Sequence, residues 1–292
     1  MARKVLLRGE VALFPKEVSY PPPLKWAGGK RWLAPFIKDI YSECGPRRLV
    51  EPFVGGMAVS LHILPKTALL NDANVHLINF YKHLQRGLEL EIPLVNDKEH
   101  YYSARERFNQ LIRTGEAESK EAAELFYYLN RTGFNGLCRF NKKGEFNVPF
   151  GKYKHISYKK DFREYAEILA DYVFTSGDFR DLPLDPEDFV YADPPYDVEF
   201  TEYSAGGFSF EDQIDLAALL SKHGGPVLIS NQATSRIVEL YGDYGFDTIF
   251  LSAPRRISSN GDRSPALEVL AARGIDGKLL RQVFSSHDVF VR

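Results

Sequence analysis

The chain has 292 residues, of which 44% are hydrophobic and 26% charged, enough for one catalytic domain with a smaller module. Its two cysteines, Cys44 and Cys138, have no metal-type spacing and exclude a disulfide framework. The first twenty residues contain no long apolar run, so we expect neither a signal peptide nor a membrane span, and a reducing cytoplasm as the compartment.

The charge of the chain is unevenly distributed. The formal net charge of −2 is not typical of a nucleic-acid-binding protein. However, residues 130–163 contain nine Lys and Arg against two acids, and residues 176–202 contain nine acids against one Arg. The basic segment could hold a polyanion, although a solvated surface explains either segment equally well.

The first half of the chain predicts strands that alternate with helices. Residues 1–20 read as an extension with weak β character, followed by three prolines. The next expected elements are a helix at Arg31–Tyr41, strands at 48–53 and 67–70, and helices at Ala58–Leu64 and Asn74–Arg86.

A different composition interrupts this alternation. Residues 87–125 are charged and helical in pattern, and residues 130–160 predict loops with short hairpins. Strand patterns then return, with the last two expected to be an antiparallel pair: 172–175, 189–192, 226–230, 248–251 and 268–271.

This order predicts an α/β sheet with helices on both faces and an inserted, mostly helical lobe. The expected divisions are an extension at 1–20, a catalytic domain formed by 21–80 and 165–272, a lobe at 81–164 and a C-terminal tail at 273–292.

The strongest chemical signal is Asp193-Pro194-Pro195-Tyr196, which directly follows a predicted strand. Ligands of such sheets bind at the carboxyl ends of the strands. The prolines make a rigid loop in which the Asp193 carboxylate and the Pro194 carbonyl are two acceptors. An aryl amine such as adenine N6 could donate hydrogen bonds from both of its hydrogens to them, which would localise its lone pair, and Tyr196 could stack on the base. The structural alternative is a stiffened turn with a helix-capping aspartate.

Other strand ends could bind a nucleotide. Residues 51–56 form a glycine turn that lets the backbone approach a ligand, although a plain turn explains it too. Asp72 could accept from ribose hydroxyls or could cap the following helix. Asp178 and Phe179 could line an adenine ring. Residues 25–30 lack the P-loop spacing, and an ordinary basic turn is the alternative to a tryptophan packed on a cofactor.

Taken together, these motifs resemble the Dam family of DNA adenine methyltransferases from about residue 22 to about residue 272. The motifs in chain order are Leu24-Lys25-Trp26-Ala27-Gly28-Gly29-Lys30, Glu51-Pro52-Phe53-Val54-Gly55, Asp72, Tyr128-Leu129-Asn130-Arg131, Gly136-Leu137-Cys138-Arg139, the segment 144–151, Asp193-Pro194-Pro195-Tyr196, Leu228-Ile229-Ser230-Asn231 and the segment 255–261.

The resemblance implies a Rossmann-like, S-adenosylmethionine-dependent methyltransferase sheet with an inserted DNA-recognition lobe. It implies double-stranded DNA as the partner, a flipped adenine as the acceptor, and direct displacement without a metal or a covalent cysteine. The implied catalytic residues are Asp193, Pro194 and Tyr196. The implied cofactor-binding residues are Trp26, Lys30, Phe53, Gly55, Asp72, Asp178, Phe179 and Asp193.

The resemblance also implies that the lobe reads the sequence GATC. Arg139 would bind guanine O6 and N7, and Phe134 would insert into the opened base stack. Leu137 would touch a base edge, while Lys142 and Lys143 would contact phosphates. The complete set of implied DNA-binding residues is Arg131, Phe134, Asn135, Leu137, Arg139, Asn141, Lys142, Pro149, Lys152, Tyr153 and Asn260.

Two departures from the family pattern bear on these expectations. Met57 stands where the family usually has a further glycine, which could alter cofactor affinity. Phe134 replaces a more usual tyrosine, which keeps stacking and loses a hydroxyl.

Three other functions are compatible with such a sheet. The first, methylation of cytosine N4, RNA or a protein amide, is disfavoured by the lobe. The second, a cofactor-impaired DNA-binding regulator of the same fold, is disfavoured by the intact Asp193 and Tyr196. The third, a small-molecule oxidoreductase, lacks the dinucleotide glycine fingerprint.

Overall fold

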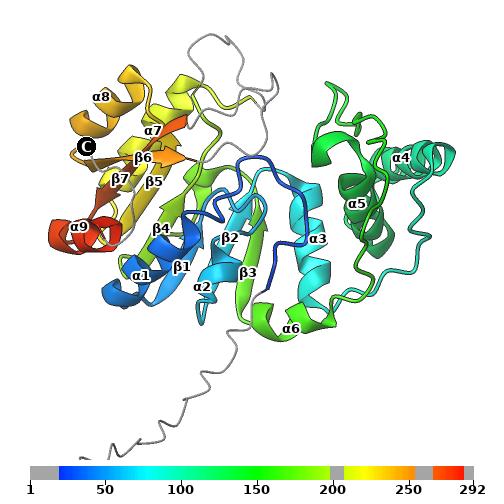
Figure 1. Cartoon of the computed structure of the whole chain (residues 1–292), viewed down its shortest axis with the longest axis horizontal. Helices are drawn as coiled ribbons and strands as arrows, with labels where there is room; N and C mark the ends of the chain where they lie inside the picture. The colour runs from blue at the N-terminus through cyan, green and yellow to red at the C-terminus, as the bar shows by residue number, and fades with distance from the viewer. Residues whose placement is uncertain (1–19, 198–206, 254–265, 286–292) are drawn as a thin grey trace, which may run out of the picture.

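A computed structural model describes residues 20–197, 207–253 and 266–285 of the chain. Within these ranges one seven-stranded sheet has the order β3-β2-β1-β4-β5-β7-β6 (Figure 1). β7 is antiparallel to β5 and β6, and the other neighbours are parallel. The strands are β1 Arg48–Glu51, β2 Ala68–Asp72, β3 Tyr172–Ser176, β4 Asp188–Ala192, β5 Val227–Gln232, β6 Asp247–Ala253 and β7 Ala266–Arg273.

Every predicted strand is present, and the expected Rossmann-like α/β architecture is confirmed. β1 ends at Glu51, two residues earlier than predicted, because Pro52 has no N–H to donate to the ladder. The late antiparallel pair is also confirmed, as β6 and β7.

Side chains cap the N-termini of α3, α4, α5, α7 and α8. The first helix is shifted three residues from its expected position, because Pro35 lies in its first turn and Gly45 ends it in the left-handed conformation. The helices are α1 Ala34–Cys44, α2 Ser60–Ile63, α3 Val75–Gln85, α4 Lys98–Arg113, α5 Lys120–Thr132, α6 Arg163–Leu169, α7 Phe210–Ser221, α8 Ser235–Asp243 and α9 Gly277–Ser285, with short 3₁₀ turns η1 Phe134–Gly136 and η2 Phe179–Asp181.

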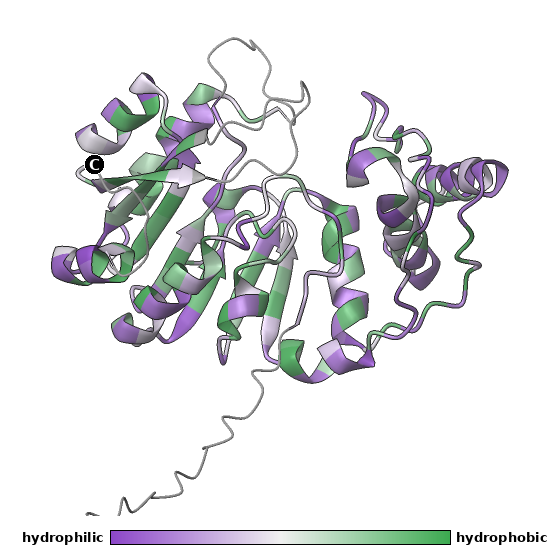
Figure 2. Cartoon of the chain, viewed as in Figure 1, coloured by the Kyte–Doolittle hydropathy of each residue, from purple (hydrophilic) through white to green (hydrophobic). Residues whose placement is uncertain are grey.

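Alternate residues of the strands pack against opposite helix layers. Leu49 and Leu70 belong to the core shared with α1, α2 and α3, whereas Val50 and Leu69 belong to the core shared with α7 and α8. The strands are accordingly apolar over much of their length, while the helices have polar outer faces (Figure 2). This two-sided burial leaves the strand ends as the places where polar side chains reach solvent.

A lobe formed by α4, α5 and the loops around residues 133–160 lies beside the sheet, with α3 between them (Figure 1). The Phe80 ring on α3 stacks on Tyr127 of α5 with centroids 5.9 Å apart. The Asn79 amide donates to the Ala117 and Ser119 carbonyls ahead of α5. Helix α3 therefore supports the lobe as well as the sheet.

The segment expected as a C-terminal tail forms α9 and packs on α1. Its Phe284 ring stacks on Phe36 with centroids 5.3 Å apart. Residues 1–19 of the expected extension at 1–20, residues 286–292 of the expected tail, and the motif at 255–261, which includes Asn260, lie outside the described residues.

No helix in the described ranges is both long and apolar enough to cross a membrane.

Candidate active site

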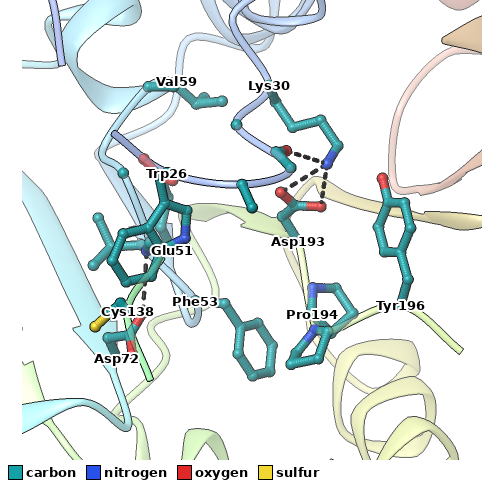
Figure 3. Close-up of a pocket in the computed structure, with 18 of the residues that line it drawn as sticks. Trp26, Lys30, Glu51, Phe53, Val59, Asp72, Cys138, Asp193, Pro194 and Tyr196 are labelled. Carbon is teal, nitrogen blue, oxygen red and sulfur yellow. Dashed lines mark hydrogen bonds and ion pairs between the residues drawn. The ribbon is translucent and has the colours of Figure 1, made fainter. Parts of the chain in front are cut away.

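A cavity of about 500 Å³ opens at the carboxyl ends of β1, β2 and β4 (Figure 3). Residues 26–30 and residues 136–138 of the lobe complete its wall, together with Phe208. Its volume is typical of a small-molecule site. The cavity lies where the alternation of strands and helices predicts a ligand.

The turn after β1 is built around the Trp26 side chain. A Cβ atom on Gly55 would lie 2.7 Å from Trp26 Nε1, and one on Gly56 would lie 2.7 Å from Trp26 Cβ. Gly55 also has a φ of 46°, in the left-handed region that glycine adopts readily. The two glycines therefore let the indole form part of the cavity wall, which a plain turn would not require.

Met57 follows this turn with a φ of 57° and a fully buried side chain. The left-handed conformation costs a side-chain-bearing residue about 1–2 kcal/mol. Burial of the methionine offsets this cost. Gly56 and Ala58 line the cavity but Met57 does not, so the feature expected to alter cofactor affinity has no direct contact with the cavity.

The Asp72 carboxylate at the end of β2 is fixed by two backbone donors. Its Oδ2 accepts from Gly55 N at 3.1 Å, and its Oδ1 accepts from Asn74 N at 2.9 Å. The Asn74 side chain, which accepts from His76 N and Leu77 N, caps α3. The alternative role of Asp72 as the helix cap is therefore wrong. Burial raises the pKa of Asp72, and the two N–H donors oppose that rise.

Glu51 is a second, fully buried carboxyl group in the cavity wall. It accepts from Ser60 N at 2.9 Å, at the start of α2. Burial raises its pKa to about 8, with a smaller contribution from the charge of Asp193. Glu51 belongs to one of the sequence motifs, but the sequence alone predicts no role for it. The available signal was an acid that ends an apolar strand just before a glycine turn.

Asp193 directly follows β4 and is held by two side chains, of which Figure 3 shows Lys30. Lys30 Nζ lies 2.9 Å from Oδ1 and 3.0 Å from Oδ2. Ser230 Oγ donates to Oδ1 at 2.8 Å, and the same hydroxyl lies 3.0 Å from the Tyr191 hydroxyl. Lys30 is only 3% exposed and also donates to Gly28 O at 2.7 Å. The carboxylate is therefore charge-paired and fixed in orientation.

Tyr196 presents its ring beside this cluster. Lys30 Nζ lies 4.6 Å from the ring centroid, within the range of a cation–π contact. Burial raises the pKa of the Tyr196 phenol, which therefore stays protonated. Pro194 and Tyr196 both line the cavity, so the three expected catalytic residues come together at one edge.

Buried amides anchor this loop from below. Gln213 on α7 donates to Pro195 O at 2.8 Å and accepts from Asn231 Nδ2 at 3.0 Å. Asn231 in turn accepts from Asp197 N at 3.4 Å. The Arg236 guanidinium on α8 pairs with the Asp197 carboxylate. Both α7 and β5 therefore fix the loop after β4. The sequence of the loop does not reveal these contacts.

Asp178 and Phe179 do not line the cavity. Phe179 is 4% exposed and packs 5.5 Å from the Phe53 ring, which does line it. Asp178 caps η2 and pairs with Arg180. The other six expected cofactor-binding residues surround the cavity: Trp26, Lys30, Phe53, Gly55, Asp72 and Asp193.

The lobe meets the cavity at residues 136–138. The Asn130 side chain binds the backbone of Lys25. Its Oδ1 accepts from Lys25 N at 2.8 Å, and its Nδ2 donates to Lys25 O at 2.9 Å. Lys25 Nζ donates to Arg131 O and lies 3.7 Å from the Tyr153 ring centroid. Burial and the neighbouring Arg131 lower the pKa of Lys25 to about 8. Lys25 therefore joins the cavity wall to the lobe, although the sequence analysis gave it no function.

The expected DNA-binding residues differ in their surroundings. Phe134 is 47% exposed, while Leu137 lines the cavity. Asn141 is engaged within its own turn, where Oδ1 accepts from Lys143 N and Glu145 N. The remaining described candidates are exposed or half-buried on the lobe: Arg131, Asn135, Arg139, Lys142, Pro149, Lys152 and Tyr153.

Comparison with known proteins assigns this arrangement to a family. The family model for D12 class N6 adenine-specific DNA methyltransferases matches residues 26–253. The chain belongs to this family. The enzyme is thus an adenine-specific DNA methyltransferase, and the alternative of cytosine N4 as the acceptor is wrong.

Curated relatives agree with the assignment. The retron Ec67 DNA adenine methylase of Escherichia coli is 38% identical over 265 residues, which cover 86% of this chain and 90% of the relative. A DNA adenine methylase of Vibrio cholerae is 38% identical over 269 residues, covering 85% and 94%. The type II methyltransferase M1.LlaDCHI of Lactococcus lactis is 36% identical over 257 residues, covering 80% and 88%. The resemblance of the ordered motifs to DNA adenine methyltransferases is confirmed.

Proposed function

We propose that the enzyme transfers a methyl group from S-adenosylmethionine to N6 of a flipped adenine within GATC in double-stranded DNA. The observation that carries the proposal is the setting of Asp193, whose carboxylate is held by Lys30 and Ser230 beside the cavity. Adenine N6 in a duplex is paired, so the base must leave the stack to reach this loop.

The loop after β4 does the acceptor chemistry. Asp193 and the Pro194 carbonyl accept hydrogen bonds from the two N6 hydrogens, which localises the nitrogen lone pair that attacks the methyl group. Lys30 and Ser230 hold the carboxylate in advance, so it need not reorganise during the reaction. The Tyr196 ring offers a stacking surface to the base. After the transfer, the methylated nitrogen loses one proton to the Asp193 carboxylate that accepts its hydrogen bond.

The cavity suits a cationic, adenine-containing cofactor. Trp26 and Phe53 provide aromatic surface, and the braced Asp72 carboxylate can accept from ribose hydroxyls. Glu51 adds a carboxyl group with no hydrogen-bonded or ion-paired cation among the described residues. S-adenosylmethionine, when bound, supplies an electrophilic methyl group for direct displacement.

Features of the lobe support a role in DNA recognition. Lys152 has a φ of 48°, a strained conformation for a residue with a long side chain, and strained residues concentrate at functional sites; Asn135 has a φ of 53°, which asparagine adopts readily. Phe134 is exposed and is suited to enter an opened base stack. Arg139 and Lys142 are exposed cations, suited to a guanine edge and a phosphate respectively.

The test is a methyl-transfer assay with labelled S-adenosylmethionine and two duplexes, one with GATC and one with that site scrambled. The products are digested and the modified nucleoside is identified. We expect label on adenine N6 from the GATC duplex alone, no label with Asp193→Ala, and full activity with Glu187→Ala. Glu187 is an exposed acid next to β4, at the end away from the cavity.

Label in both duplexes would retain the chemistry and refute the GATC assignment. An Asp193→Ala variant that is as active as the wild-type enzyme would refute the role of Asp193. A wild-type protein that binds DNA but fails to bind S-adenosylmethionine in calorimetry would instead support the regulator alternative.

A further inference from the structure

The lobe carries a hairpin, residues 139–147, whose two ends lie side by side. Asn147 N donates to Arg139 O at 3.1 Å, and Phe140 pairs with Phe146 in an antiparallel bridge. The Asn141 side chain closes the turn between them. The side chains of Arg139 and Asn147 therefore start from directly opposed backbone positions.

The hairpin is fixed to the rest of the lobe by buried contacts. The Asn109 amide on α4 accepts from Phe146 N at 2.7 Å and donates to Phe146 O at 3.1 Å. The Phe140 ring stacks on His76 of α3 with centroids 4.9 Å apart. Phe146 is 2% exposed and packs against Phe108. The backbone of Arg139 is therefore held at a fixed position relative to α3.

The Arg139 guanidinium is bound along one edge by Asn147. Its Nε donates to Asn147 Oδ1 at 2.7 Å, and its Nη2 donates to Asn147 O at 3.3 Å. This edge uses two of the five guanidinium donors. Among the described residues, Nη1 and the second hydrogen of Nη2 have no protein partner, and because Arg139 is exposed they can form a fork for a ligand. Such a fork matches the O6 and N7 acceptors of guanine.

We propose that Asn147 is a positioning residue for sequence recognition, which orients the guanidinium fork of Arg139 toward a guanine edge. The inference rests on the proposed function, because it assumes that Arg139 reads the site. A free arginine must lose rotamer freedom when it binds a base edge. Asn147 fixes the side chain beforehand, so the correct base gains more from the contact than an incorrect base does.

The test measures kcat/KM on a GATC duplex and on a matched AATT duplex, which keeps the adenines and removes every guanine of the site. The quantity of interest is the ratio of the two values. We expect Arg139→Ala to lower this ratio and Asn147→Ala to lower it about tenfold, in line with the loss of part of one bidentate contact. Asn147→Asp retains the acceptor and should keep most of the ratio.

A double variant separates positioning from general damage. In the Arg139→Ala background, Asn147→Ala should change the ratio less than about twofold, since no guanidinium remains to be held. If Asn147→Ala lowers kcat/KM on both duplexes equally, or leaves the ratio unchanged while Arg139→Ala lowers it, the inference is overturned. A wild-type ratio near one would overturn the proposed GATC recognition itself, which distinguishes the two failures.

Discussion

The chemistry of Asp193 depends on individual neighbours that come from distant parts of the chain. Lys30 lies 163 residues away in sequence and Ser230 lies 37 residues away, yet both reach the same carboxylate. A hydrogen bond to a charged group contributes about 1.5–3 kcal/mol when the group is buried. Each neighbour therefore has a separable effect on the reaction.

Ser230→Ala tests one of these effects. We expect the rate of methyl transfer to fall about tenfold to a hundredfold, because Asp193 loses a fixed donor. Cofactor affinity, measured by calorimetry, should change little. Ser221→Ala is the matched control, since that hydroxyl donates only to Ala218 O within α7. A wild-type rate for Ser230→Ala would show that Lys30 alone orients the carboxylate.

Glu51 gives the protein without cofactor a predictable dependence of stability on pH. Its pKa is about 8 in the folded chain, well above the usual value for glutamate. Between those two values the native state binds more protons than the unfolded state, so the free energy of unfolding falls as pH rises. The stabilisation is present below the usual pKa and is lost as pH rises through about 8.

Glu51→Gln should remove this dependence. Compared with the wild-type protein, the variant should gain stability steadily from pH 5 to pH 8 in urea unfolding without cofactor. Glu187→Gln, an exposed acid, should follow the wild-type curve. Parallel curves for Glu51→Gln and the wild-type protein would mean that Glu51 ionises normally in the folded chain.

At the scale of elements, the loop after β4 is rigid because α7 and β5 hold it. Gln213 connects Pro195 O with the Asn231 amide, and both amide side chains are almost fully buried. A displacement of about 1 Å in a reacting group can cost about a hundredfold in rate. The supports of the loop should therefore affect turnover more than cofactor binding.

Gln213→Met tests this element. We expect kcat to fall about tenfold to a hundredfold while the cofactor Kd stays within about threefold, because the cavity wall itself is unchanged. The free energy of unfolding should also fall by about 1–3 kcal/mol, since Asn231 loses a buried partner. Gln110→Met, on the exposed face of α4, is the control. An unchanged kcat would show that Arg236 and Asp197 fix the loop without Gln213.

Features that depend on the local sequence pattern could be predicted, whereas contacts between residues distant in the chain could not. Asp72 and Asp193 could be predicted from the sequence, because the apolar pattern places them at the ends of buried strands. The Asn141 amide closes a local turn that the sequence does not reveal, and its contact with DNA stays a prediction. Glu51 and Ser230 were given no role, because their importance comes from burial and from a partner that only the folded chain provides.

At the scale of the whole molecule, opposite charges are separated along the chain. The basic residues 130–163 belong largely to the lobe, while acids concentrate in 176–202, which includes the cavity edge at Asp193. A formal net charge of −2 therefore hides a local cationic surface. Such a surface releases condensed counterions when it binds DNA, so its affinity depends on salt.

Lys142→Ala tests this surface. We expect the slope of log K against log salt concentration to become shallower by about 0.9, the value for one lost phosphate contact. The preference for GATC should not change, because a phosphate contact carries no sequence information. Lys66→Ala, an exposed lysine between α2 and β2, should leave the slope unchanged. A loss of sequence preference in Lys142→Ala would instead assign Lys142 to base reading.

Residues 136–138 of the lobe form part of the same cavity wall as the strand ends. Since the proposed function assigns both ligands to this wall, we expect occupancy of the cavity and engagement of DNA to be thermodynamically linked. Linkage is reciprocal: whatever factor a cofactor analogue contributes to the affinity for DNA, DNA must contribute to the affinity for the analogue. The dissociation constant for DNA then depends on the concentration of the analogue, and the dissociation constant for the analogue depends on the concentration of DNA.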